Sequence, residues 1–225
     1  MLFRSMREEL RTLMAVPDDR IAIVDDPSLD AADIPALAAA RDAAESQRAT
    51  REGRRFLAIG RLAAQKNFAL LLDAFARMAK PEDRLAIVGE GGQRRALEAQ
   101  AARLGIAARV TMPGHVNPLH GELAQADALV LSSDYEGVPA VVVEALAAGL
   151  PVVSTRCSVS MDDMLGGGRF GVLVPTGDAA ALAVAMEQVS ALPYDAAAAR
   201  AHANRFTVEI ASRAYLAAMR ASVRR

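Results

Sequence analysis

The chain has 225 residues, of which 52% are apolar, so it can bury a full hydrophobic core and is not a disordered protein. Its 26 Lys and Arg residues nearly balance its 27 Asp and Glu residues, and this balance gives no electrostatic footprint for nucleic acid. The single cysteine, Cys157, excludes a disulfide scaffold. The start of the chain has no signal-peptide pattern, and the longest apolar stretch, 138–153, is interrupted by Glu144, so we expect a cytoplasmic protein without a membrane span.

Short apolar runs alternate with helical patterns along most of the chain. Residues 21–24 resemble a strand, and a helix is predicted near 33–45. From residue 55 onward the alternation becomes regular, with six predicted strands at 55–60, 85–89, 109–112, 128–133, 151–155 and 170–174. Helices are expected between them, including short ones near 118–125 and 139–148, and two or three helices finish the chain.

Caps and apolar stripes define several of these helices. Asn67 is suited to cap a helix whose apolar stripe is Leu71, Ala74, Phe75 and Met78, and Pro81 marks its end. The helix after the second strand is predicted to turn Leu97, Ala101 and Leu104 inward and to end at Gly105. The last helix has an apolar face at Ala211, Tyr215, Ala218 and Met219.

Strands that alternate with helices of 8–14 residues indicate βαβ units and a parallel sheet. The strands are continuous apolar runs, as expected when helices cover both faces. We therefore predict a doubly wound, Rossmann-like α/β domain of about six strands over roughly 51–204. Residues 1–50 and 205–225 are expected to flank it.

Unusual residues gather after the predicted strands, where ligands bind to open parallel sheets. Arg61 and Lys66 follow the first strand at a predicted helix start, where they oppose the helix dipole unless an anion binds there. Two interpretations of Arg61 and Lys66 are open: they bind a phosphate or diphosphate, or they are a pair of solvated surface charges. The turn 89–92 (GEGG) lacks the full dinucleotide fingerprint because Arg94 replaces its third glycine, so a nicotinamide cofactor is disfavoured and a tight turn is favoured.

The segment 136–144 (EGVPAVVVE) is the most informative. Pro139 suits the first turn of a helix, and Gly137 allows a ligand to approach the backbone closely. Glu144 lies within an otherwise apolar helix, where a carboxylate needs a partner. Glu136 and Glu144 are therefore candidates to bind the hydroxyls of two polyols, unless Glu144 faces solvent.

Other chemistries receive little support. His115, His120 and His202 are scattered without metal-ligand spacing, so no metal site is predicted. Cys157 has no base nearby in the sequence and is expected to be inert.

Taken together, 60–67 (GRLAAQKN), 89–92, 133–155 and 171–178 resemble the C-terminal, donor-binding domain of GT-B-fold retaining glycosyltransferases, specifically family 4, also called glycosyl transferases group 1. The resemblance covers about residues 20–220. It implies that 1–50 is a remnant of an N-terminal region with an interdomain linker. It also implies that 205–225 is a helix that crosses back to the first domain.

The resemblance also implies roles for the candidate residues. Gly60, Arg61 and Lys66 would hold the donor diphosphate, and Glu144 would bind the ribose hydroxyls. Glu136, with the backbone of Gly137, Val138 and Pro139, would contact the transferred sugar or the phosphate. His115 and Val116 would lie beside the nucleobase. Arg61, Lys66 and Glu136 would be the catalytic set, and the reaction would need no metal or cofactor.

The family has a first domain that binds the acceptor, and only about 20 residues precede the linker here. We therefore expect an acceptor domain or a separate acceptor-binding chain as partner, and the resemblance allows peripheral membrane association through that missing half. A non-catalytic nucleotide-sugar-binding module and half of a GT-B-fold sugar-nucleotide epimerase are the alternatives.

Overall fold

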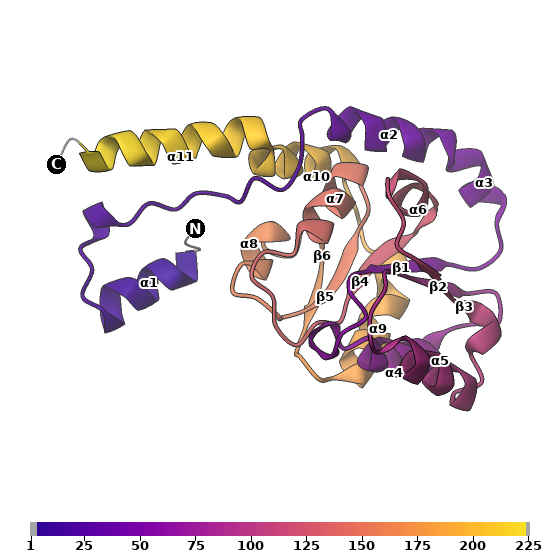
Figure 1. The fold of residues 1–225 in the computed structure, drawn as a ribbon. Helices are drawn as coiled ribbons and strands as arrows, with labels where there is room; N and C mark the ends of the chain where they lie inside the picture. The colour runs from indigo at the N-terminus through magenta and orange to yellow at the C-terminus, as the bar shows by residue number, and fades with distance from the viewer. Residues whose placement is uncertain (1–3, 224–225) are drawn as a thin grey trace.

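A computed structural model describes residues 4–223 and confirms the predicted doubly wound α/β fold (Figure 1). All strand pairs in the sheet are parallel, and the strand order is β3-β2-β1-β4-β5-β6. In chain order the strands are β1 (Arg55–Ile59), β2 (Arg84–Val88), β3 (Val110–Gly114), β4 (Ala128–Leu131), β5 (Val152–Thr155) and β6 (Gly171–Val174). The chain thus builds one half of the sheet outward from β1, and then returns to the other side of β1 at β4.

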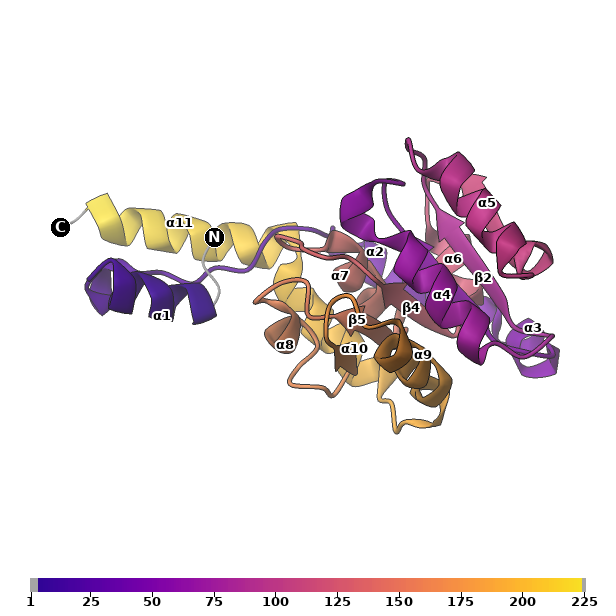
Figure 2. The same cartoon turned by 90° about the horizontal axis from the view of Figure 1, so that it is seen from below.

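Helices cover both faces of the sheet. One face carries α4 (Phe68–Met78), α5 (Arg94–Arg103) and α9 (Ala179–Gln188), as the view from below shows (Figure 2). The other face carries α2 (Asp33–Ala43), α6 (His120–Gln125), α7 (Ala140–Ala148) and α10 (Ala196–Ala203). The remaining helices are α1 (Arg4–Leu13), α3 (Glu45–Thr50), α8 (Met161–Met164) and α11 (Val208–Val223).

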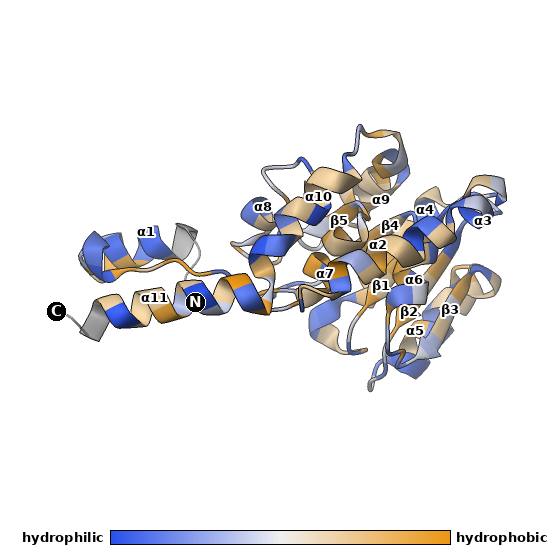
Figure 3. Ribbon diagram, turned by 90° about the horizontal axis from the view of Figure 1, so that it is seen from above, coloured by the Kyte–Doolittle hydropathy of each residue, from blue (hydrophilic) through white to orange (hydrophobic). Residues whose placement is uncertain are grey.

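The apolar core forms two layers, one on each side of the sheet. Side chains alternate along a strand, so Leu57 and Ile59 of β1 join the layer under α7, while Phe56 and Ala58 join the layer under α4. The strands are therefore buried on both faces, and the hydropathy colouring shows them as the apolar centre of the domain (Figure 3).

Capping residues account for several helix ends, and the Asn67 cap is as predicted. The side chain of Asn67 accepts a hydrogen bond from the Leu70 amide at the start of α4. Gly149 ends α7 in the left-handed region, with φ of 73°. Asp178 and Asp195 cap α9 and α10 in the same way that Asn67 caps α4. These local signals fix where each crossover helix begins or ends.

Three details differ from the sequence-based expectation. Residues 21–24 are not a strand, because they lie beside no strand of the sheet; an isolated bridge forms later, between Leu29 and Thr207. Leu104 is 37% exposed rather than inward, since α5 ends at Arg103 before its apolar stripe is complete. On α11 only the beginning of the predicted face is covered, because Ala211 is buried whereas Met219 is 62% exposed.

Residues 4–28 and α11 extend away from the sheet domain (Figure 1). They are fastened to it where they leave, because Arg205 donates to both carboxylate oxygens of Asp25 at 2.8 and 2.9 Å and to Asp163 at 2.8 Å. None of the helices within residues 4–223 combines the length and apolarity that a bilayer crossing requires.

Candidate functional site

The strand order reverses between β1 and β4, and two polar loops meet at that point. Nζ of Lys66, on the loop after β1, lies 2.6 Å from Oε1 of Glu136, on the loop after β4. The Ser133 hydroxyl donates to the same oxygen at 2.6 Å. Open parallel sheets bind their ligands in the crevice outside the carboxyl ends of strands at such a reversal. This pair therefore marks the candidate site.

Further hydrogen bonds hold the two loops together. Asn67 donates to Oδ1 of Asp134 at 2.8 Å, and the Gln65 side chain donates to the Tyr135 carbonyl at 2.9 Å. The Asp134 amide returns a hydrogen bond to the Gln65 carbonyl at 2.9 Å. Because both loops are fixed by these contacts, Lys66 and Glu136 have defined positions before any ligand arrives.

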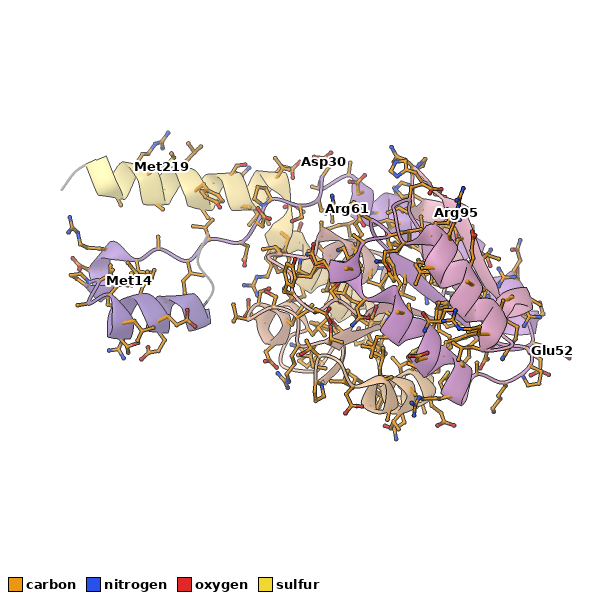
Figure 4. All side chains as sticks on the ribbon, turned by 60° about the horizontal axis from the view of Figure 1, so that its bottom comes forward. Met14, Asp30, Glu52, Arg61, Arg95 and Met219 are labelled. Atoms are coloured by element: carbon orange, nitrogen blue, oxygen red, sulfur yellow. The ribbon has the colours of Figure 1, made fainter. Side chains whose placement is uncertain are left out.

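Arg61 is on the first of these loops and is exposed at the surface (Figure 4). Within residues 4–223 its guanidinium makes no hydrogen bond or ion pair, whereas Lys66 is paired. The two cations predicted to act together thus differ in environment. Lys66 also packs its stem over Gly60, where an added Cβ would lie 3.0 Å from Cε of Lys66.

The glycine turn 89–92 has a structural explanation. Gly89 has φ of 141°, and a Cβ there would lie 2.0 Å from the Gly60 carbonyl oxygen. At Gly91 a Cβ would lie 2.4 Å from the carbonyl oxygen of Leu62. The glycines therefore let the loop after β2 pack directly against the loop after β1. Glu90 in this turn pairs with Arg94 at 2.6 Å. This confirms the tight-turn interpretation.

Helix α7 begins four residues after Glu136, and its N-terminus has no side-chain cap. Gly137 has open space where a Cβ would project, and its carbonyl accepts a hydrogen bond from Ser158 at 2.7 Å. Pro139 is buried and has no N–H, so it orients the turn and donates nothing. Val138 packs against the core. The donors of this turn are therefore backbone groups around Pro139 rather than Pro139 itself.

Glu144 is partly buried on the face of α7 toward α2 and α6. Its Oε2 is covered and has no hydrogen-bond partner within the described chain. Burial raises the pKa of Glu144, the Asp33 carboxylate raises it further, and His120 partly opposes the increase. The solvent-facing alternative does not fit this environment. An unpartnered carboxylate oxygen of this kind can accept hydrogen bonds from a bound polyol.

The loop after β3 lies beside the same edge of the sheet. His115 is exposed on it, and Val116 is partly buried against the core layer under α7. The loop after β2 lies between this loop and the loop after β1, because β2 separates β3 from β1 in the sheet. Among the described residues, the side chains of the β3 loop form no hydrogen bond or ion pair with Lys66 or Glu136.

The titratable residues elsewhere offer no second chemistry at this edge. Across residues 4–223, no three His, Cys, Asp or Glu side chains come together in a metal-binding arrangement. Cys157 is buried, and burial raises the pKa of its thiol, which disfavours the reactive thiolate. Metal independence nevertheless stays a prediction.

A family model described as glycosyl transferases group 1 matches residues 53–191, which is more than half of the chain. The chain belongs to this family. The matched region includes every loop described above, from Gly60 to Glu144.

Curated relatives share the same region. The lipopolysaccharide core biosynthesis glycosyltransferase LpsE of Rhizobium meliloti is 36% identical over 135 residues, which are 60% of this chain and 39% of that protein. The putative colanic acid biosynthesis glycosyltransferase WcaL of Salmonella typhimurium is 32% identical over 151 residues, 62% of this chain and 36% of its own length. The glycosyl transferases group 1 chain therefore spans less than half the length of these relatives.

Solved structures share the fold. The lipopolysaccharide outer core galactosyltransferase WaaB, in its apo form, superimposes with a TM-score of 0.77 at 23% identity, over 97% of this chain and 60% of that one. Anabaena HepE, in a complex with UDP and glucose, gives a TM-score of 0.65 at 26% identity, over 82% of this chain and 51% of that one. The glycosyl transferases group 1 chain thus has the architecture of about half of each structure.

Sequence reasoning missed Ser133 and Asp134 as supports of this family member's site. Both precede Glu136 within the segment already singled out, but their roles depend on contacts with residues 65–67, which are remote in sequence. The polar run 132–134 directly after an apolar strand was the available signal.

Proposed function

We propose that this chain is the donor-binding, C-terminal half of a GT-B glycosyltransferase of family 4, and that it binds a nucleoside-diphosphate sugar for transfer with retention of configuration. The observation that carries the proposal is the contact between Lys66 and Glu136 across the reversal of strand order. The domain would extend over about 51–204, between a linker within 1–50 and a crossover helix at 205–225.

In this proposal the diphosphate lies between Arg61, Lys66 and the N-terminus of α7. The Lys66 ammonium has three donors, so it can keep its contact with Glu136 and still bind a phosphoryl oxygen. Arg61 is free to turn toward the same anion, and the uncapped amides of α7 add the positive end of a helix dipole. Gly60 leaves the room that the Lys66 stem needs.

The two glutamates would bind different parts of the donor. Oε1 of Glu136 already accepts two hydrogen bonds, which leaves Oε2 for a hydroxyl of the transferred sugar. The unpartnered Oε2 of Glu144 would accept from the ribose diol. His115 and Val116 would lie beside the base, with Val116 as part of an apolar surface.

The reaction that this arrangement suits is loss of a nucleoside diphosphate from the sugar. Negative charge grows on the leaving diphosphate as its bond to the sugar breaks. Lys66 and the α7 amides would lie near that charge, and Arg61 would turn toward it, so that together they stabilise it electrostatically without a metal ion. The 225-residue chain is expected to bind the donor without transferring sugar, because an acceptor must be positioned by a second body. We place this reaction in the cytoplasm, with any membrane association through that second body.

A binding experiment with two glutamate variants tests the assignment. UDP, its 2′,3′-dideoxy analogue and UDP-glucose are titrated by calorimetry, and a guanosine series follows if uridine does not bind. Glu144→Gln should weaken UDP by about tenfold but hardly affect the dideoxy analogue, because a carboxylate contributes only where its hydroxyl partner exists. Glu136→Gln should retain UDP affinity and weaken UDP-glucose.

Glu187→Gln, on the exposed surface of α9, is the matched control and should change none of the titrations. Identical ligand profiles for Glu136→Gln and Glu144→Gln would contradict the division of roles. Absence of saturable binding by any nucleoside diphosphate would contradict the proposed function as a whole.

A further inference from the structure

A second charged site lies at the opposite end of the sheet from the Lys66–Glu136 pair. A hollow of about 520 Å³ opens there among residues that precede β1, β4 and β5 and those that follow α9. Four arginines line it, against two acidic residues: Arg41, Arg48, Arg51, Arg54, Glu45 and Asp127. Three of these arginines have a carboxylate partner, since Arg48 pairs with Glu45, Arg51 with Asp127 and Arg54 with the buried Asp83 behind the lining. Arg41 is the one that has none among the described residues.

The arginines are crowded as well as numerous. Arg41 donates to the carbonyls of Leu123 and Ala126 at 3.1 and 2.9 Å, which holds its guanidinium in place without neutralising it. Burial lowers the pKa of Arg41 to about 10, and the charge of Arg48 lowers it further in the same direction. A buried guanidinium without a carboxylate partner is unfavourable, and an anion bound in the hollow would stabilise it.

Several polar atoms around the hollow lack hydrogen-bond partners. Among the described residues, the atoms concerned are Nε and Nη1 of Arg48, Oη of Tyr194 and Nε of Arg200. Arg200 lies close to Arg41 and Tyr194, since its charge acts on both. Buried donors are normally satisfied, so a group of them around one charged hollow points to a missing acceptor.

Glu45 shows how an anion would enter. It forms an ion pair with Arg48 within α3, and its side chain is 65% exposed while that of Arg48 is 13% exposed. Such an exposed carboxylate one turn away is weakly held and can move into solvent. A stronger acceptor that displaced Glu45 would pair with the Arg48 guanidinium and would offer an oxygen to the other unsatisfied donors.

We propose that this hollow binds a phosphate-bearing ligand, whose phosphoryl oxygens accept hydrogen bonds from Arg48 and Tyr194. A phosphate group offers several acceptor oxygens and a negative charge to balance Arg41. Val189 and Leu192 also line the hollow and would contact the organic part of a phosphate ester. Free phosphate esters and phospholipid headgroups share this chemistry. The site is separate from the proposed donor site, because five-residue strands place about 17 Å between the two ends of the sheet.

Calorimetric titration of the purified chain with inorganic phosphate and pyrophosphate, at constant ionic strength set with chloride, tests the proposal. We expect saturable binding, with pyrophosphate the tighter ligand. Arg48→Gln and Tyr194→Phe should each weaken pyrophosphate about tenfold or more, as for loss of a charge-assisted hydrogen bond. Glu45→Gln should tighten it, because the competing carboxylate is gone.

Matched variants separate this site from the donor site and from general charge effects. Arg61→Ala should leave pyrophosphate binding at the hollow intact, and so should Arg95→Gln, an exposed arginine on α5 (Figure 4). Loss of binding in Arg61→Ala but not in Arg48→Gln would overturn the proposal, as would equal losses in Arg48→Gln and Arg95→Gln. Thermal unfolding without ligand checks that each variant folds; Tyr194→Phe should not lower the midpoint, since it removes an unsatisfied hydroxyl.

Co-sedimentation with phosphatidylglycerol vesicles identifies the source of the phosphate. Vesicle binding that is lost in Arg48→Gln and Tyr194→Phe, without saturable binding of soluble phosphate, would assign the hollow to a lipid headgroup. Soluble binding alone would assign it to a small phosphorylated molecule. Failure of both would refute the site, whatever the outcome of the nucleotide titrations.

Discussion

Lys66 and Glu136 are 70 residues apart in the sequence, yet their side chains form a hydrogen-bonded ion pair of 2.6 Å that joins the loops after β1 and β4. Both side chains are largely covered, with 18% and 9% exposure. A ligand that reaches Lys66 therefore also meets Glu136.

Arg61→Ala and Lys66→Ala are expected to weaken nucleoside diphosphate binding by about 10–150-fold each, since charge-assisted hydrogen bonds contribute about 1.5–3 kcal/mol. Nucleoside binding should hardly change, because the lost contacts are to phosphate. Arg61→Ala should leave the unfolding midpoint unaltered, as Arg61 is exposed. Calorimetry with both ligands provides the measurement, with Arg95→Ala as control; equal losses for nucleoside and diphosphate would refute the phosphate assignment.

Glu144→Gln should raise the thermal unfolding midpoint near pH 8. The pKa of Glu144 is raised in the folded chain, chiefly by burial, so the folded state holds the proton more tightly than the unfolded state does. The ionised carboxylate costs stability once the pH rises through the folded pKa, and that cost is absent below the unfolded pKa. The gap between variant and wild type should therefore close as the pH falls toward 4. A gap that is independent of pH, or one equal to that of Glu187→Gln, would contradict this explanation.

Asp83→Asn should destabilise the fold by about 3 kcal/mol, the scale for breaking a buried ion pair. Asp83 is 1% exposed and accepts from the Arg54 side chain at 2.6 Å and from the Arg54 and Lys80 amides at 2.8 and 2.9 Å. Burial opposes ionisation, but these hydrogen bonds outweigh it and lower the pKa of Asp83.

The stabilisation by Asp83 is present above its unfolded pKa and is lost as the pH falls through the lower folded value. Thermal melts should show a midpoint about 6–12 °C below wild type at pH 7, and a smaller difference in acid. Asp42→Asn, at an exposed position of α2, is the control. If Asp83→Asn and Asp42→Asn have the same unfolding midpoint, the hydrogen bonds of Asp83 contribute no net stability.

Asn67→Ala should cost more stability than Asn67→Gly. Asn67 has φ of 44° in the left-handed region, caps α4 and donates to Asp134. Alanine loses the cap and strains the backbone, together about 2 kcal/mol, whereas glycine loses the side-chain contacts but adopts this φ freely. Urea unfolding midpoints decide the order, and the reverse order would show that the backbone is not strained by alanine.

The sequence predicted the alternating elements well because each carries a local signal. Six apolar runs became six strands, and the Asn67 cap and Gly149 end are set by residues beside them. The strand predicted at residues 21–24 was wrong, because residues with β propensity form a strand only where a partner strand is available. The prediction that Leu104 faces inward was wrong, because α5 ends one residue before it.

The site was predictable only in part, because local sequence signals do not show which remote residues come together. Arg61, Lys66, Glu136 and Glu144 stand out by residue type against apolar or helical neighbours. Their neighbours Ser133 and Asp33 do not, because proximity in space rather than in sequence gives them their effect. The arginine hollow was missed entirely, since its residues are spread from α2 to the segment before α10 and form no motif.

Two stretches of backbone leave the sheet domain together, joined by hydrogen bonds from the Ser28 amide to the Phe206 carbonyl at 3.0 Å and from the Val208 amide to the Leu29 carbonyl at 2.8 Å. A body attached through one stretch can swivel in any direction. A body attached through two adjacent, cross-linked stretches rotates mainly about the single axis that passes through both. If a partner domain is attached through these stretches, its motion toward the Lys66–Glu136 edge would thus be a rotation about that axis. Spin labels on α1 and α4 would detect this rotation as a change in the distance between them.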